Sequence, residues 1–143
     1  MISERLLDIR EDANLNQEEM AEILKTTQSN YSRWETGTQL IPLEKLNLLC
    51  NYFDVSMNFV VGLTRNKNGN GKHKLDPKVI GKNIKTLREK NNITQTDLAN
   101  LLNTTQSTIS AYESGKNLII ISFVVQIINK YKISLDWLCG RTK

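Results

Sequence analysis

A chain of 143 residues that is 39% hydrophobic and carries a formal net charge of +4 has the composition of an ordinary globular protein. No stretch approaches the roughly 18 apolar residues of a membrane span, and no charged segment leads an apolar run at the N-terminus, which argues against membrane and secreted proteins. We therefore expect a cytoplasmic protein with no membrane partner.

The chain contains one unit twice. The segment TTQSNYSRWETG at residues 26–37 returns as TTQSTISAYESG at residues 104–115, an offset of 78 positions. The same offset joins further pairs without a gap: Arg10 and Arg88, Gln17 and Gln95, Glu35 and Glu113, Gly62 and Gly140. A solenoid would need about three stacked repeats, so two copies predict two small domains.

Within each copy, apolar residues recur at helical spacing and nothing alternates as a strand would, which predicts an all-α fold of five short helices. The first helix is expected over about residues 3–14 of copy one. The expected caps of the second and third helices are Asn16 with Glu19, then Thr27, in copy one, and Thr94 with Asp97, then Thr105, in copy two.

The third helix, predicted over residues 28–36 and 106–114, carries the candidate site. At about 100° per residue, Tyr31 and Trp34 share one side and belong in the core. The other side of copy one holds an amide, hydroxyls and an arginine, namely Gln28, Ser29, Ser32 and Arg33. Glutamine pairs well with adenine and arginine with guanine in the major groove. Most polar helix faces are merely solvated. Here, however, another helix and a turn of only a few residues directly precede the polar helix, which favours contact with DNA over simple solvation.

The fourth helix differs between the copies. In copy one it is predicted over residues 43–53, with Glu44, Lys45 and Asn47 as a solvated face. In copy two the segment IISFVVQIINKY is apolar nearly all round, which predicts that it is covered on a second side. The expected interface residues are Ile120, Phe123 and Val125; the alternative is a slightly larger core in copy two. Ser56 and Ser134 are expected to open the fifth helix.

Asn, Gly and Lys dominate the joint between the copies, so residues 65–75 are predicted to form a flexible basic linker between domains 1–64 and 76–143. Asp76 and Pro77 then supply a cap and a first helical residue. Residues 1–64 carry a net charge of −5 and the rest +9, which favours copy two for contact with phosphates. His73 has no second candidate ligand nearby and reads as a solvated loop residue, so no metal or cofactor is expected.

Both copies resemble the Cro/Xre-type helix-turn-helix domain of phage and bacterial repressors. The resemblance rests on NQEEMAEILKTTQSNYSRWETG and TQTDLANLLNTTQSTISAYESG, with the closing VSMNFVVGLT and ISLDWLCGRT. It implies that the second helix lies across the phosphate backbone and that the third enters the major groove. The DNA-binding residues it implies are Gln17, Gln28, Ser29, Ser32 and Arg33 in copy one, and Gln95, Gln106, Ser107, Ser110, Lys116 and Asn117 in copy two.

The resemblance also implies a structural ion pair between the first helix and the end of the third, Arg10 with Glu35 and Arg88 with Glu113. The turn before the third helix often needs a residue that tolerates positive φ, where glycine is usual. Lys25 and Asn103 stand in that region here, and asparagine tolerates it better than lysine.

The predicted function is sequence-specific binding of double-stranded DNA by a repressor-like transcriptional regulator. The two third helices would be brought to one operator either within the chain, as a pseudo-dimer, or in a homodimer. The alternative is an antitoxin-like adaptor whose copy one holds a partner protein and whose copy two holds DNA. An enzyme is not expected, because no nucleophile with its base, metal cluster or phosphate-binding glycine loop is present.

Overall fold

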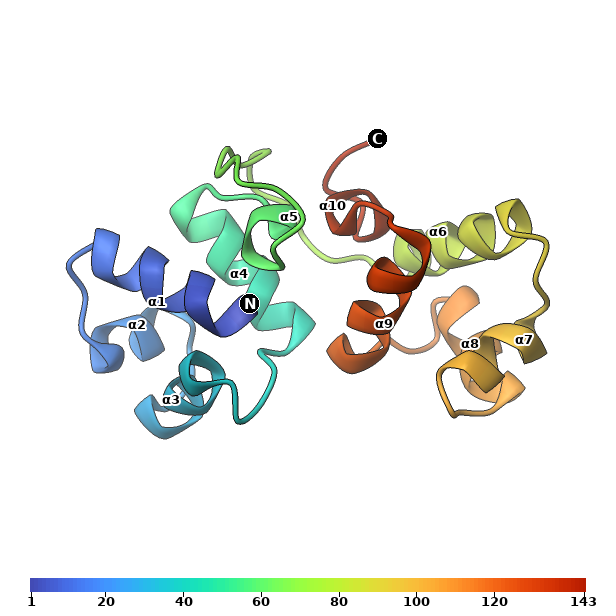
Figure 1. Cartoon of the computed structure of the whole chain (residues 1–143), viewed down its shortest axis with the longest axis horizontal. Helices are drawn as coiled ribbons and strands as arrows, with labels where there is room; N and C mark the ends of the chain where they lie inside the picture. The colour runs from blue at the N-terminus through green and yellow to red at the C-terminus, as the bar shows by residue number, and fades with distance from the viewer. The chain divides into compact units, whose positions relative to one another are not determined.

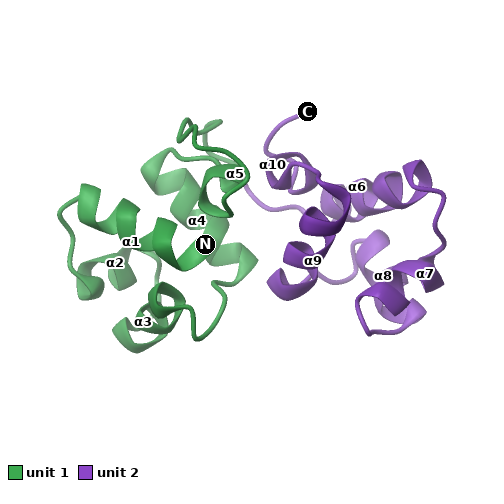
Figure 2. Ribbon diagram, in the orientation of Figure 1, with its two compact units in different colours: residues 1–73 green, residues 74–143 purple.

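The computed structural model describes residues 1–143 and consists of helices, turns and one isolated antiparallel bridge between Val55 and Asn68. It divides into two compact units, Met1–His73 and Lys74–Lys143 (Figure 2). Unit 1 contains α1 (Ile2–Asp12), α2 (Gln17–Ile23), α3 (Gln28–Thr36), α4 (Leu43–Phe53) and α5 (Met57–Val60). Unit 2 contains α6 (Pro77–Lys90), α7 (Gln95–Leu101), α8 (Gln106–Glu113), α9 (Ile121–Tyr131) and α10 (Leu135–Leu138) (Figure 1). The predicted all-α fold of two five-helix units is confirmed.

The helices begin where side chains can accept hydrogen bonds from their first backbone N–H groups. Asn16 with Glu19 and Thr94 with Asp97 form complete capping boxes. The other side-chain caps are Thr27, Ser56, Asp76, Thr105 and Ser134, as the sequence predicted. Each cap satisfies a donor that the helix itself leaves unpaired.

The same offset of 78 positions relates the backbone bends of the two units. Five pairs of residues adopt positive φ: Asn14 with Asn92, Lys25 with Asn103, Gly37 with Gly115, Asp54 with Lys132, and Gly62 with Gly140. Lys25 and Asn103 confirm the predicted turn before the third helix, at φ 56° and 54°. The first helix ends at Asp12 rather than at about residue 14 as expected. Asn14 has a φ of 56°, which a right-handed helix cannot contain.

Each unit packs its helices around a core of its own. In unit 1, α1 contacts α3 and α5, and α2 contacts α3. In unit 2, α6 contacts α8 and α10, and α7 contacts α8. Gly81 allows the close approach of α6 to α8, because a Cβ there would collide with the carbonyl oxygen of Tyr112. The side chains of Cys50 and Cys139 are buried in the cores of the two units.

The chain after α5 folds back onto unit 1. Most of the segment 65–75, which was expected to be a flexible linker, is therefore part of that unit. The backbone N–H of Ser56 donates to the carbonyl of Lys67 at 3.2 Å. Further along, the His73 carbonyl accepts hydrogen bonds from Asn47 at 2.9 Å and Asn51 at 2.8 Å, and the His73 N–H donates to Asn51 at 3.0 Å. These bonds belong to unit 1, which ends at His73.

The same contacts overturn two details of the sequence interpretation. Asn47, expected on a solvated face, is only 7% exposed, since it lies one turn before Asn51 on α4 and shares the His73 carbonyl. His73 is half-buried rather than a solvated loop residue. With residues 65–73 included, unit 1 holds 8 basic and 10 acidic residues, a net charge of −2, and unit 2 holds 11 basic and 5 acidic residues, a net charge of +6.

Candidate nucleic-acid interface

Each unit has two successive short helices joined by a tight turn, α2 with α3 and α7 with α8 (Figure 1). The turn in unit 1 passes through Lys25, whose carbonyl accepts a hydrogen bond from Lys45 on α4 at 3.1 Å. That bond anchors a backbone conformation that costs a lysine about 1–2 kcal/mol. In unit 1, α3 therefore leaves the turn in a fixed direction.

An ion pair ties the far end of α3 to α1. The Arg10 guanidinium donates to both Glu35 oxygens, at 2.8 and 2.7 Å, and to the Leu15 carbonyl at 2.9 Å. The Arg10 and Glu35 side chains are 17% and 7% exposed. In unit 2, Arg88 contacts both oxygens of Glu113, at 2.8 and 3.1 Å. The predicted pairs are thus confirmed, in the two-pronged geometry that favours arginine.

The ion pair keeps Glu35 charged. Burial would by itself raise the pKa of this carboxyl, but hydrogen bonds from Arg10 and Gln17 and the nearby Tyr31 hydroxyl outweigh it and hold the pKa below its ordinary value. Burial first, and then the neighbouring carboxylate, raises the pKa of Tyr31, so its hydroxyl remains protonated. Glu35 is therefore a fixed acceptor of hydrogen bonds.

From this carboxylate a chain of side-chain amides leads to the start of α3. Gln17 Nε2 donates to Glu35 Oε1 at 3.3 Å, and Gln28 Nε2 donates to Gln17 Oε1 at 2.9 Å. An ionised carboxylate can only accept, so the Gln17 amide must present its oxygen to Gln28. The Gln28 amide is thereby oriented, with its carbonyl oxygen and second N–H left for a ligand.

Unit 2 repeats this relay. Gln95 donates to Glu113 at 3.1 Å and Gln106 donates to Gln95 at 2.6 Å. The family resemblance implied only that Gln17 and Gln95 contact DNA and missed their second role as links to the ion pair. The signal that could have found it is the spacing of 11 residues between the two glutamines, which both copies keep.

Most of the other predicted residues lie on the third helices, where Gln28, Ser29, Arg33, Gln106 and Ser107 are exposed. Lys116 and Asn117 lie just after α8 and are exposed as well. Ser32 and Ser110 are half-buried. Sequence reasoning also missed Asn30, whose side-chain oxygen accepts a hydrogen bond from Arg33 at 3.2 Å while its amide donates to Thr26 at 3.2 Å. Arg33 is thus held by a residue that the turn itself anchors.

The surfaces beside the third helices differ in charge. On α2 of unit 1, Glu18, Glu19 and Glu22 are all exposed. The corresponding residues of α7 are Thr96, Asp97 and Asn100, with one carboxylate among them. Because phosphates repel carboxylates, unit 2 offers the better surface to a nucleic-acid backbone.

The expected interface residues of α9 are not equally exposed. Ile120, the residue before α9, is 50% exposed. Phe123 and Val125 are half-buried, and the Phe123 ring stands edge-on to Tyr112 with centroids 6.4 Å apart. Phe123 therefore contributes to the packing of unit 2 as well as to its surface, and Ile120 is the better residue for a test of association.

Comparison with known proteins agrees with this arrangement. The helix-turn-helix family model matches the chain twice, at residues 6–60 and 84–138. An uncharacterised HTH-type transcriptional regulator, YobD of Bacillus subtilis, is 34% identical over 93 residues, which cover 65% of this chain and 76% of that protein. The antitoxin PezA of Streptococcus pneumoniae is 31% identical over 65 residues, which cover 46% of this chain and 41% of that protein. No solved structure shows a significant match.

None of the helices combines the length and the apolar character needed to cross a membrane. No three His, Cys, Asp or Glu side chains are grouped so that they could hold a metal ion.

Proposed function

Because the chain belongs to the helix-turn-helix family, we propose that it is a sequence-specific, repressor-like regulator of transcription whose α3 and α8 enter the major groove of DNA. The observation that carries this proposal is the relay from the ion pair to Gln28, and its copy at Gln106. An oriented glutamine amide can pair with the N6 and N7 atoms of adenine. The protein acts by binding rather than by catalysis, and in the cytoplasm.

The test is selection of binding sites from a random pool of DNA duplexes with the full chain, followed by footprinting. Two recognition helices with the same oriented glutamine should enrich two half-sites that share an adenine, centred about one helical turn, or about 34 Å, apart. A pool that shows no enriched sequence after repeated selection would refute sequence-specific binding.

Unit 2 should supply most of the affinity for the phosphate backbone. We expect residues 74–143 to bind duplex DNA with a steep dependence of log K on log salt, and residues 1–73 to bind far more weakly with a shallow one, because their net charges are +6 and −2. Fluorescence anisotropy over a salt series measures both slopes. Glu18→Thr with Glu22→Asn, which introduces the residues of unit 2, should strengthen binding by residues 1–73. Equal slopes for the two original fragments would contradict the prediction.

The α9 surface is proposed to join two copies of the chain, or the two units of one chain, on the operator. Ile120→Glu places a charge on an apolar surface that is 50% exposed, and we expect it to reduce association and lower DNA affinity while helix content is kept. Sedimentation velocity and circular dichroism measure these effects. Val79→Glu, at a residue 41% exposed in the same unit, is the matched control. Identical sedimentation and DNA affinity for Ile120→Glu and the original protein would exclude the interface.

A second candidate is the adaptor, in which unit 1 binds a partner protein and unit 2 binds DNA. Two observations favour it: the three exposed carboxylates on α2, which suit a basic partner better than a phosphate backbone, and the similarity to a protein named as an antitoxin. The fragment experiment separates the two proposals, since an adaptor would show no DNA binding by residues 1–73 even after the α2 substitutions.

A further inference from the structure

The first turn of α6 lies directly against the turn that follows α8. Gly81 permits this approach, since a Cβ there would collide with the carbonyl oxygen of Tyr112. The contact at Gly115, which has a φ of 78°, is also close. A Cβ on Gly115 would lie 2.6 Å from Cγ of Lys78 and 2.8 Å from its Cα. The side chain of Lys78 therefore begins on the backbone that leads into Lys116.

The position of Lys116 is set by α8, because its backbone N–H donates to the carbonyl of Ala111 at 3.0 Å. Consecutive Cα atoms are about 3.8 Å apart, so the contact at Gly115 leaves the Cα atoms of Lys78 and Lys116 at most about 8 Å apart. Both lysine side chains are exposed. Their ammonium groups can therefore reach the same small region of solvent beside the end of α8.

Neither lysine has a carboxylate of the protein within ion-pair distance. The acidic residues that lie near them in the sequence have other partners. Asp76 caps α6 by accepting a hydrogen bond from the backbone N–H of Lys78 at 2.9 Å. Glu113 accepts hydrogen bonds from Arg88 and Gln95. Two like charges this close repel each other, so an external anion beside them is favoured.

Resting on the proposed function, we propose that Lys78 binds a DNA phosphate next to the one that Lys116 contacts. The start of α6 is then part of the nucleic-acid interface of unit 2, whereas the sequence assigned no DNA contact to the first helix of either unit. Phosphates follow one another every 3.4 Å or so of axis along one strand, which two lysines at this separation can match. A phosphate contact carries no base information, so Lys78 adds affinity without changing the sequence selected.

The test compares Lys78→Gln, Lys116→Gln and the double variant in the full chain. Glutamine keeps the Cβ and Cγ atoms that pack on Gly115, so unit 2 should remain folded. We expect each single substitution to make the slope of log K against log salt shallower by about 0.9, and the double variant by about twice as much. With equal affinities at 1 M salt as the reference, each single loss weakens binding at 0.1 M salt about eightfold. Lys78→Arg keeps the charge and should keep the slope.

These affinities are measured on two duplexes, the one enriched by site selection and one of unrelated sequence. Single phosphates of the enriched duplex are then replaced in turn by neutral methylphosphonates. Replacing the phosphate that Lys78 binds should weaken the original protein severalfold and leave Lys78→Gln unaffected. Lys116→Gln should still respond to that replacement and should be insensitive to one at the neighbouring phosphate.

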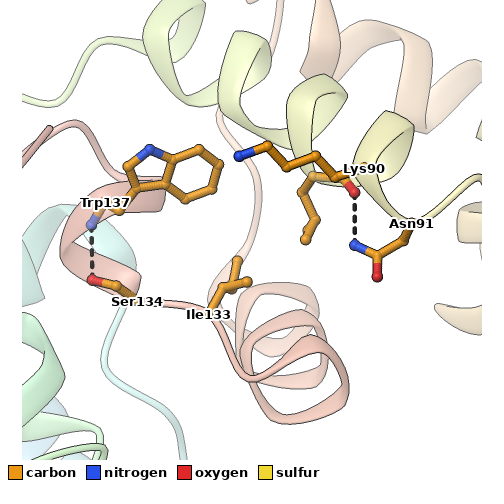
Figure 3. A pocket seen from close by; sticks show the side chains of 6 residues that line it. Lys90, Asn91, Ile133, Ser134 and Trp137 are labelled. Atoms are coloured by element: carbon orange, nitrogen blue, oxygen red, sulfur yellow. Dashed lines mark hydrogen bonds between the residues drawn. The ribbon is translucent and has the colours of Figure 1, made fainter.

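Lys90→Gln is the matched control, because Lys90 lies on the same helix and is also exposed. It is 12 positions after Lys78, which corresponds to about 18 Å along α6. Figure 3 shows its side chain reaching toward the Trp137 ring of α10, where both residues line a pocket of about 330 Å³. Lys90→Gln removes the same charge from unit 2 and should leave the salt slope unchanged.

Three results would overturn the phosphate contact of Lys78: an unchanged slope for Lys78→Gln, equal losses for Lys78→Gln and Lys90→Gln, or a Lys78→Gln variant that responds to every methylphosphonate as the original protein does. Enrichment of a DNA sequence alongside any of them would leave the proposed function standing. Absence of DNA binding by the original protein would overturn both.

Discussion

Glu35→Gln should unfold unit 1 selectively. The substitution leaves the Arg10 guanidinium, only 17% exposed, without its carboxylate, and breaking a buried pair in this way costs about 3–5 kcal/mol. A domain below about 70–80 residues rarely has more than about 3–5 kcal/mol of stability to lose. We therefore expect urea unfolding followed by NMR to show unit 1 largely unfolded at 25 °C while the signals of unit 2 persist. Glu113→Gln should produce the opposite pattern.

The matched control is Asp12→Asn, which breaks the pair with Lys67. Those side chains are 66% and 58% exposed, so the expected cost is at most about 1 kcal/mol. If Glu35→Gln and Asp12→Asn lowered the stability of unit 1 by the same small amount, the ion pair would not be what holds α1 to α3.

The pH dependence of unit 1 follows from the same carboxylate. The folded-state pKa of Glu35 lies below its ordinary value of 4.5, so its contribution is fully present above pH 4.5 and is lost as the pH falls through the lower folded-state value. Glu35→Gln should remove this part of the acid sensitivity of unit 1. Thermal unfolding midpoints of unit 1, which for the variant are expected below 25 °C, should converge at low pH when the two proteins are measured on both sides of pH 4.5.

Arg33→Ala should weaken DNA binding by about 1–3 kcal/mol and relax the preference at one base pair of one half-site. Arg33 is exposed and is held by Asn30, whereas the corresponding residues of unit 2 are Ala111 and Thr108. A guanidinium can donate two parallel hydrogen bonds to guanine, and unit 2 has no group that does so from this position. Site selection with the variant and affinities for single-base changes at one salt concentration measure the effect.

Two variants separate base recognition from charge. Arg33→Lys keeps the charge but loses the planar pair of donors, so it should relax specificity while the salt dependence stays unchanged. Thr108→Asn with Ala111→Arg should give unit 2 a guanine preference that it lacks. An unchanged selected sequence for Arg33→Ala would show that Arg33 contacts the phosphate backbone or no DNA at all.

Local patterns in the amino-acid sequence are enough to predict the helices and their repetition. Helix caps such as Asn16 and Thr27, and turn residues at positive φ, depend on neighbours only a few positions away in the chain. The same is true of the helical spacing of apolar residues, so local patterns identify all three. The ion pair between Arg10 and Glu35, 25 positions apart, came from the family resemblance, and the structure supplied its two-pronged geometry.

The partners of several polar side chains become apparent only when the packing of the helices is known. Gln17 looks solvent-facing in the sequence, yet it joins Glu35 to Gln28 because α1, α2 and α3 converge there. The sequence likewise predicts a solvated position for Asn47 and a flexible linker after α5. In the fold, Asn47 instead donates a hydrogen bond to the carbonyl of His73 in that segment. Such contacts depend on which helices pack together and not on local helix propensity, so they cannot be predicted from the spacing of apolar residues.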